Sequence, residues 1–237
     1  MRTSRRYLVL SMVSLLVGVG AAFLSDRHDC PSPCQTRAER IDRLCEKAMH
    51  SAIAGDFDEG ERYARELIRL DPSEAYHQEM MAYALRGQND PRASITYYER
   101  AIQLAKTREH ANSLVLADSY IGLAANLHSL ERDDEALQQA DKAIQIADAR
   151  RRIRDHAADY YQLACAYAVR STISDGPQQL RDRGSAIANL QFAVEKGFDG
   201  WDHMAGDLDL KALHDDAEFE GLFPDGNVPT PALRYER

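Results

Sequence analysis

The sequence predicts an all-α protein: an α-solenoid of about four helix-turn-helix units, closed by a C-terminal segment and preceded by an N-terminal apolar segment. Two observations predict the solenoid. Apolar residues recur at spacings of three and four, and the pattern repeats along the chain with alanine at matching places. A third observation, a basic start followed by an apolar run, predicts a membrane helix or signal peptide. The chain has 237 residues, of which 44% are hydrophobic, enough to bury a core.

The N-terminal segment, residues 1–24, has the composition of a membrane-directed sequence. Arg2, Arg5 and Arg6 precede 18 residues without a charge, from Tyr7 to Leu24. An uncleaved anchor needs about 17–25 apolar residues, which this run supplies, whereas the small residues at 20–22 suit a cleaved signal peptide. Both interpretations place the body outside the cytoplasm, either on a single-pass anchor or as a secreted or periplasmic protein.

Residues 25–38 have the composition of a linker and contain two cysteines. Cys30 and Cys34 are separated by a proline-containing stretch, and an oxidising compartment would allow a local disulfide between them. His28 adds a third candidate metal ligand. Because a structural zinc site takes four ligands, we expect no metal here.

Helix-turn-helix units fill residues 39–197. They begin near residues 41, 75, 117 and 157, so their spacings are 34, 42 and 40 residues. The extra length predicts longer helices around 106–116 and 147–156, and a loop over 170–183. Helix axes approach to about 8 Å only where the residues at the crossing are small. Alanine takes these places at Ala48, Ala82, Ala124 and Ala164 in first helices, and at Ala101, Ala143 and Ala193 in second helices.

The first unit resembles the tetratricopeptide repeat (TPR). Ala48 stands at its eighth place, Gly55 at its fifteenth, and Asp71-Pro72 at places thirty-one and thirty-two. It departs from the family at Gly60 and Ala64, where the family prefers alanine and an aromatic residue. The resemblance implies a right-handed solenoid in which the first helix of each unit lines a concave face. It also implies protein binding, without naming a partner.

The concave face is therefore the candidate binding surface. The partner-contacting residues that the resemblance places on it are Met49, Tyr76, Glu79, Tyr83, Arg86, Ile121, His128 and Tyr161. TPR proteins that grip chaperone tails carry a clamp of basic and amide side chains on this face. The matching positions here are Cys45, Met49, Met80, Asp118 and Gly122, none of them basic or amide, so no chaperone-tail clamp is predicted.

Residues 198–223 resemble the closing segment of bacterial proteins with a TPR end-of-group domain. They include the run Asp207-Leu208-Asp209-Leu210. The last unit of a solenoid has no successor to cover its apolar face, so we expect this segment to act as a cap. The side chains expected to cover that face are Trp201, Leu208, Leu210, Leu213, Phe219 and Phe223. Residues 224–237 have the composition of a flexible tail.

Charge and motifs limit the function. The net charge is −9 although residues 1–24 are basic, so the body repels phosphate backbones and nucleic acid is not an expected partner. No catalytic motif with a recognised spacing is present, so neither an enzyme nor a cofactor is expected.

The sequence predicts a membrane-tethered or exported scaffold or adaptor that binds a protein or peptide partner. The alternatives are a structural spacer in the cell envelope and a small metal or redox protein using His28, Cys30 and Cys34. The oligomeric state stays open.

Overall fold

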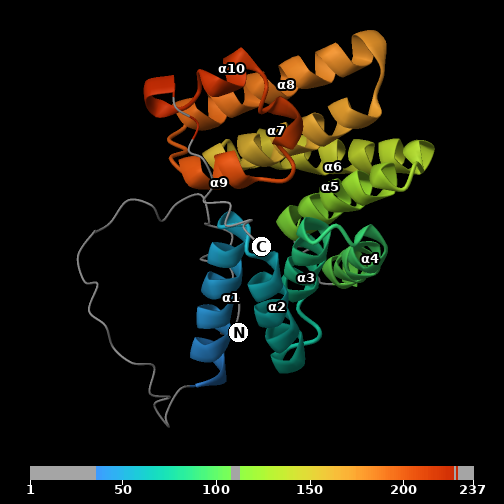
Figure 1. The fold of residues 1–237 in the computed structure, drawn as a ribbon, viewed down its shortest axis with the longest axis vertical. Helices are drawn as coiled ribbons and strands as arrows, with labels where there is room; N and C mark the ends of the chain where they lie inside the picture. Colours follow the sequence, from blue (N-terminus) through green and yellow to red (C-terminus); the bar gives the residue numbers. More distant parts are fainter. Residues whose placement is uncertain (1–35, 108–112, 227, 229–237) are drawn as a thin grey trace, which may run out of the picture.

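The computed structural model describes residues 36–107, 113–226 and 228, and every regular element in that part of the chain is a helix. Eight long helices form four antiparallel pairs, stacked in chain order (Figure 1). The pairs are α1 (Arg37–Ile53) with α2 (Phe57–Leu70), α3 (Ala75–Gly87) with α4 (Pro91–Thr107), α5 (Ser113–Ser129) with α6 (Asp133–Arg154), and α7 (Ala157–Ile173) with α8 (Gly176–Glu195). The predicted all-α stack of helix-turn-helix units is confirmed.

Local signals start and stop these helices. The Thr36 side chain caps α1 by accepting from the Glu39 amide, and the Glu39 side chain accepts from the Thr36 amide in return. Asp56 caps α2 by accepting from the Glu59 amide. Between these helices Gly55 has a φ of 72°, a backbone conformation that glycine adopts without strain. The turn that the sequence marks at this position therefore reverses the chain.

Alanine closes the crossings between helices. All seven alanines predicted for the crossings are at most 3% exposed. Gly122 of α5 serves the same purpose for a larger neighbour: a Cβ added there would lie 2.1 Å from the Cζ atom of Tyr98. Tyr98 is itself 1% exposed, so its ring occupies the space that the missing side chain leaves. Small residues thus set how closely the pairs stack.

Two buried ion pairs join the later helices. Arg150 of α6 donates to Asp159 of α7 at 2.8 Å, and Arg170 of α7 donates to Asp182 of α8 at 2.6 Å. Both carboxylates are 1% exposed or less. A buried carboxylate without its partner is strongly destabilising, so each arginine is needed where it lies.

The C-terminal segment consists of short helices: α9 (Trp201–Gly206), η1 (Lys211–Leu213), α10 (Ala217–Glu220) and η2 (Pro224–Gly226). Its apolar side chains Leu210, Leu213, Phe219 and Phe223 are buried in the same core cluster as α7 and α8, and Trp201 packs against that cluster. Leu208 lies outside the cluster. The segment also reaches the other end of the molecule, because α9 contacts α1 (Figure 1).

The predicted loop over 170–183 is wrong. Helix α7 continues to Ile173 and α8 begins at Gly176, so Ser174 and Asp175 alone separate them. Pro177 suits the first turn of α8 because its missing amide hydrogen has no helical partner there. The third unit begins at Ser113 instead of near residue 117, and α6 extends to Arg154 as the spacing predicted.

Several predictions fall outside the described residues. They concern the apolar segment 1–24, His28, Cys30 and Cys34 in the linker, and all but the start of the tail at 224–237. Within the described residues, no helix combines the length and the apolar character needed to cross a bilayer.

Candidate functional site

The C-terminal segment crosses the concave face of the array. Tyr161 of α7 donates its hydroxyl to Asp207 at 2.7 Å. On the opposite side, the Leu208 amide donates to the hydroxyl of Tyr83 in α3 at 3.3 Å. Residues 207–210 therefore span the gap between the second and the fourth helix pairs.

An ion pair strengthens this crossing. Arg86 of α3 donates to Asp209 at 2.6 Å, and the two side chains are only 10% and 14% exposed. A charge-assisted bond between largely buried groups is stronger than the same bond at the surface. The arginine is thus engaged with the protein's own C-terminal segment.

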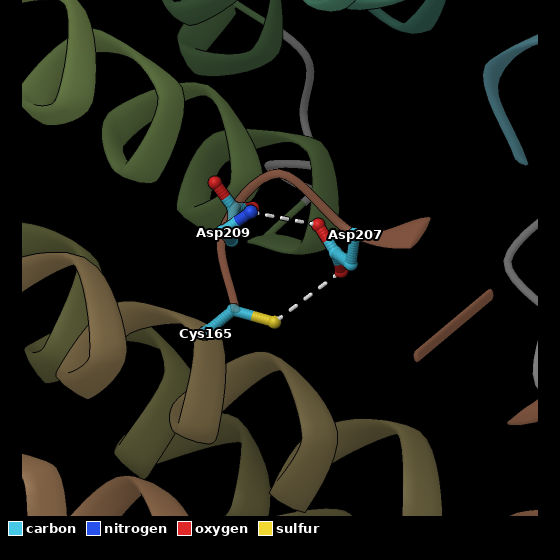
Figure 2. Close-up of side chains that lie close together, drawn as sticks. All are labelled: Cys165, Asp207 and Asp209. Atoms are coloured by element: carbon cyan, nitrogen blue, oxygen red, sulfur yellow. Dashed lines mark hydrogen bonds between the residues drawn. The ribbon is translucent and has the colours of Figure 1, made fainter. Parts of the chain in front are cut away.

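The Asp207 side chain holds the turn at 207–209. The Asp209 amide donates to Asp207 at 3.0 Å, the arrangement of an Asx turn. The Cys165 thiol of α7 donates to the other carboxylate oxygen of Asp207 at 3.7 Å (Figure 2). The turn therefore presents both acidic side chains to the interior of the array.

A cavity of about 200 Å³ lies under the turn, lined by residues of the turn and of helices α1, α2, α3, α4, α5, α7 and α9. Four tyrosines and four carboxyl groups dominate its polar lining. These are Tyr76, Tyr83, Tyr98 and Tyr161, with Glu79, Asp118, Asp207 and Asp209. None of the described lining residues is a lysine or an arginine; His203, at its edge, lies 3.8 Å from Asp207.

Enclosure changes the acid strength of these carboxyl groups. Burial, with smaller contributions from Asp209 and Asp207, raises the pKa of Asp118 to about 7, against a hydrogen bond from Gln162 that lowers it. Burial likewise raises the pKa of Asp209 to about 6, although Arg86 opposes the change. The pKa of Glu79 rises well above its usual value, through burial first and then through Asp118. These groups share a low-dielectric space with too little positive charge.

One carboxylate oxygen is also left without a hydrogen bond. Oε2 of Glu79 is buried and has no partner among the described residues. Buried polar atoms are nearly always paired in folded proteins, so such an atom beside a cavity marks a place where a ligand donor would fit.

Cys165, Asp207 and Asp209 bring three potential metal ligands within 4.8 Å of one another (Figure 2). A metal would have to compete with Arg86 for Asp209 and with the Tyr161 hydroxyl for Asp207. It would also have to deprotonate Cys165, whose pKa burial raises well above its usual value. The arrangement is a poor metal site as it stands.

The structure brings most of the predicted groove residues together. Five of the eight line the cavity: Met49, Tyr76, Glu79, Tyr83 and Tyr161. Arg86 lies next to them and holds Asp209. Ile121 does not join them, since α5 is covered by helices on several sides and this residue is 0% exposed. His128 lies apart and bonds to Asp133 at 2.7 Å.

Sequence reasoning missed the acidic contribution of the C-terminal segment. Asp207 and Asp209 stood in a run expected only to cap the last unit. The partner of Asp209, Arg86 in α3, is 123 residues away in the chain, and no repeat position signals that contact. The acidic run itself was the available signal, because alternating carboxylates are unusual in a purely apolar cover.

No protein-family model matches the chain, and no curated protein matches it. Solved structures do match, among them the crystal structure of MamA protein. That similarity has 17% sequence identity and a TM-score of 0.29, and it covers 67% of this chain and 92% of that one. A similarity of this size carries no conclusion about what the chain does.

Proposed function

We propose that this chain is a TPR-type protein-interaction module whose concave face receives a projecting element of a protein or peptide partner. The observation that supports this best is the meeting of five predicted groove residues around one cavity, although they come from three different helices. Aromatic side chains and methionine, which are enriched at protein interfaces, supply most of that set. Because residues 207–210 cross the face, the partner inserts a side chain or chain end, and not a long helix.

A site-specific crosslink tests this proposal. A photo-crosslinking amino acid replaces Met49, which lines the cavity, in the full chain in native membranes. The matched control carries the same group at Glu99, an exposed position on α4. We expect a protein captured from position 49 and not from position 99. Capture of the same proteins from both positions, or none from either, contradicts the proposal.

We propose in addition that residues 1–24 hold the module at a membrane with its body outside the cytoplasm. The arginine flank and the length of the apolar run support this. Alkaline extraction with external protease digestion tests it: an anchored body stays in the membrane and is digested from outside. Release by alkali with a shortened N-terminus indicates a cleaved signal peptide, and full protection from external protease contradicts the orientation.

A further inference from the structure

We propose that the cavity under the 207–210 turn binds an alkylammonium group, such as the end of a lysine side chain. The inference rests on the proposed function, in which a protein partner delivers that group to the concave face. It names the chemistry of the partner's inserting element.

Charge is the first argument. Glu79 from α3, Asp118 from α5, and Asp207 and Asp209 from the C-terminal turn all line the cavity. Two arginines act on these groups from outside the lining: Arg86 is paired with Asp209, and Arg150, which bonds to Asp159, also acts on Asp118. The cavity therefore gathers four carboxyl groups with no lysine or arginine among its described lining residues. A monovalent cation entering it would favour the ionised forms of these groups and be attracted by several of them at once.

Hydrogen bonding is the second argument. Oε2 of Glu79 is buried without a donor. An ammonium group carries three donors and no acceptor, so it complements a cavity rich in carboxylate oxygens. It would supply the missing bond of Glu79 while its other donors reach further acceptors in the lining.

The tyrosines are the third argument. Tyr76, Tyr83, Tyr98 and Tyr161 all border the cavity. The faces of aromatic rings attract cations within about 6 Å, and organic ammonium ions are recognised in this way. Apolar neighbours such as Met49 and Ile53 would contact the carbon stem that carries the ammonium group.

Size favours an organic cation over a bare metal ion. A cavity of about 150 Å³ accommodates a benzene-sized molecule, and this one measures about 200 Å³. A butylammonium stem is of that order. A divalent metal would fill little of the space and would need Cys165 as a thiolate or Asp209 without its arginine.

In the chain alone, burial raises the pKa values of Asp118 and Glu79. A bound cation would favour their ionised forms and draw both pKa values down.

Isothermal titration calorimetry of the full chain in an uncharged detergent tests the inference at fixed ionic strength and pH 8. The probes are n-butylammonium chloride, its neutral analogue n-butanol, and calcium chloride. We expect saturable binding of n-butylammonium at one site, weakened at least tenfold by Glu79→Gln and by Asp118→Asn. The surface variant Glu99→Gln makes the same charge change outside the cavity and should bind like the parent.

Four outcomes overturn the inference. They are no saturable binding of n-butylammonium, equal weakening by Glu99→Gln, equally tight binding of n-butanol, and displacement of the amine by tighter-binding calcium. A circular dichroism melt of each variant confirms that it is folded, so that loss of binding reports on the cavity.

A second titration, with a short peptide as the probe, distinguishes failure of this inference from failure of the proposed function. Acetyl-Gly-Lys-Gly-amide binding more tightly than n-butylammonium supports delivery by a protein chain. If n-butylammonium binds and the peptide does not, a free amine is the ligand and partner binding on this face fails. If neither binds while Met49 still crosslinks to a partner, the proposed function stands and the cation site fails.

Discussion

Buried charge is balanced in one region of the molecule and unbalanced in another. The two regions are the ion pairs between the later helices and the cavity on the concave face. Between α6, α7 and α8, each buried carboxylate has a nearby arginine: Arg150 for Asp159 and Arg170 for Asp182. Around the cavity, four carboxyl groups gather, and neither Arg86, which bonds to Asp209, nor Arg150, which acts on Asp118, is among the lining residues. Balanced charge is what a stable interior requires. The imbalance on the concave face is costly to the fold alone, which suggests that it serves a ligand.

Removing one partner of a buried ion pair should have the largest effect on stability. Asp159→Ala removes the ion-pair partner of the buried Arg150 and leaves its hydrogen bond to Ser113, so we expect the free energy of unfolding to fall by about 3–5 kcal/mol. Urea denaturation followed by circular dichroism measures it.

The control is Asp141→Ala, which removes a carboxylate that is 56% exposed and bonds to Arg170. It should stay within about 1 kcal/mol of the parent. Equal losses in the two variants would show that burial of the pair is not what matters.

The next largest loss of stability is expected for Gly122→Ala, which places a methyl group in the space taken by Tyr98 at the edge of the cavity. The added Cβ would overlap the tyrosine ring, so we expect a loss of about 1–3 kcal/mol in the same denaturation assay.

Gly184→Ala is the matched control, because it lies in α8 with nothing within 4 Å of the added Cβ. This variant should gain about 0.5–1 kcal/mol from the helix preference of alanine. A gain at position 122 as well would mean that Tyr98 moves aside freely.

A smaller effect should appear in the pH dependence of stability. In the folded chain the pKa of Asp118 is about 7 and that of Asp209 is about 6, against about 3.9 for an unfolded aspartate. Between these values the folded state holds more protons than the unfolded state. The free energy of unfolding therefore falls as pH rises from 6 to 8.

Asp118→Asn removes one of these groups and should flatten that fall, leaving the variant about 1–2 kcal/mol more stable than the parent at pH 8. Melting curves at pH 6, 7 and 8 measure the slopes. Glu99→Gln should keep the slope of the parent; a slope unchanged in Asp118→Asn would refute the raised pKa.

The stacked helix pairs could be predicted from the sequence because their signals are local. Ala82 and Ala124 stand at repeat positions, and both are fully buried. The groove was predicted in part for the same reason, since Tyr76, Glu79 and Tyr83 follow helical spacing along one helix.

The rest depended on contacts that no local pattern encodes. Ile121 has the spacing of a groove residue, but packing on several sides of α5 buries it. Asp207 and Asp209 belong to a run whose pattern predicts a C-terminal cap. Only the folded array brings Asp209 to Arg86 of α3 and Asp207 to Tyr161 of α7. The membrane segment and the linker cysteines remain predictions.

The crossing at residues 207–210 also bears on cooperativity. In an open solenoid each unit contacts only its neighbours, so units can unfold one at a time. Here the bond between Arg86 and Asp209 joins residues 123 positions apart and links the second helix pair to the C-terminal segment. Such a closure raises the contact order of the fold and slows its formation. The closure also fixes the curvature of the array, so we expect the first and last helix pairs to unfold together. A partner that displaced residues 207–210 would therefore allow the curvature of the whole array to change.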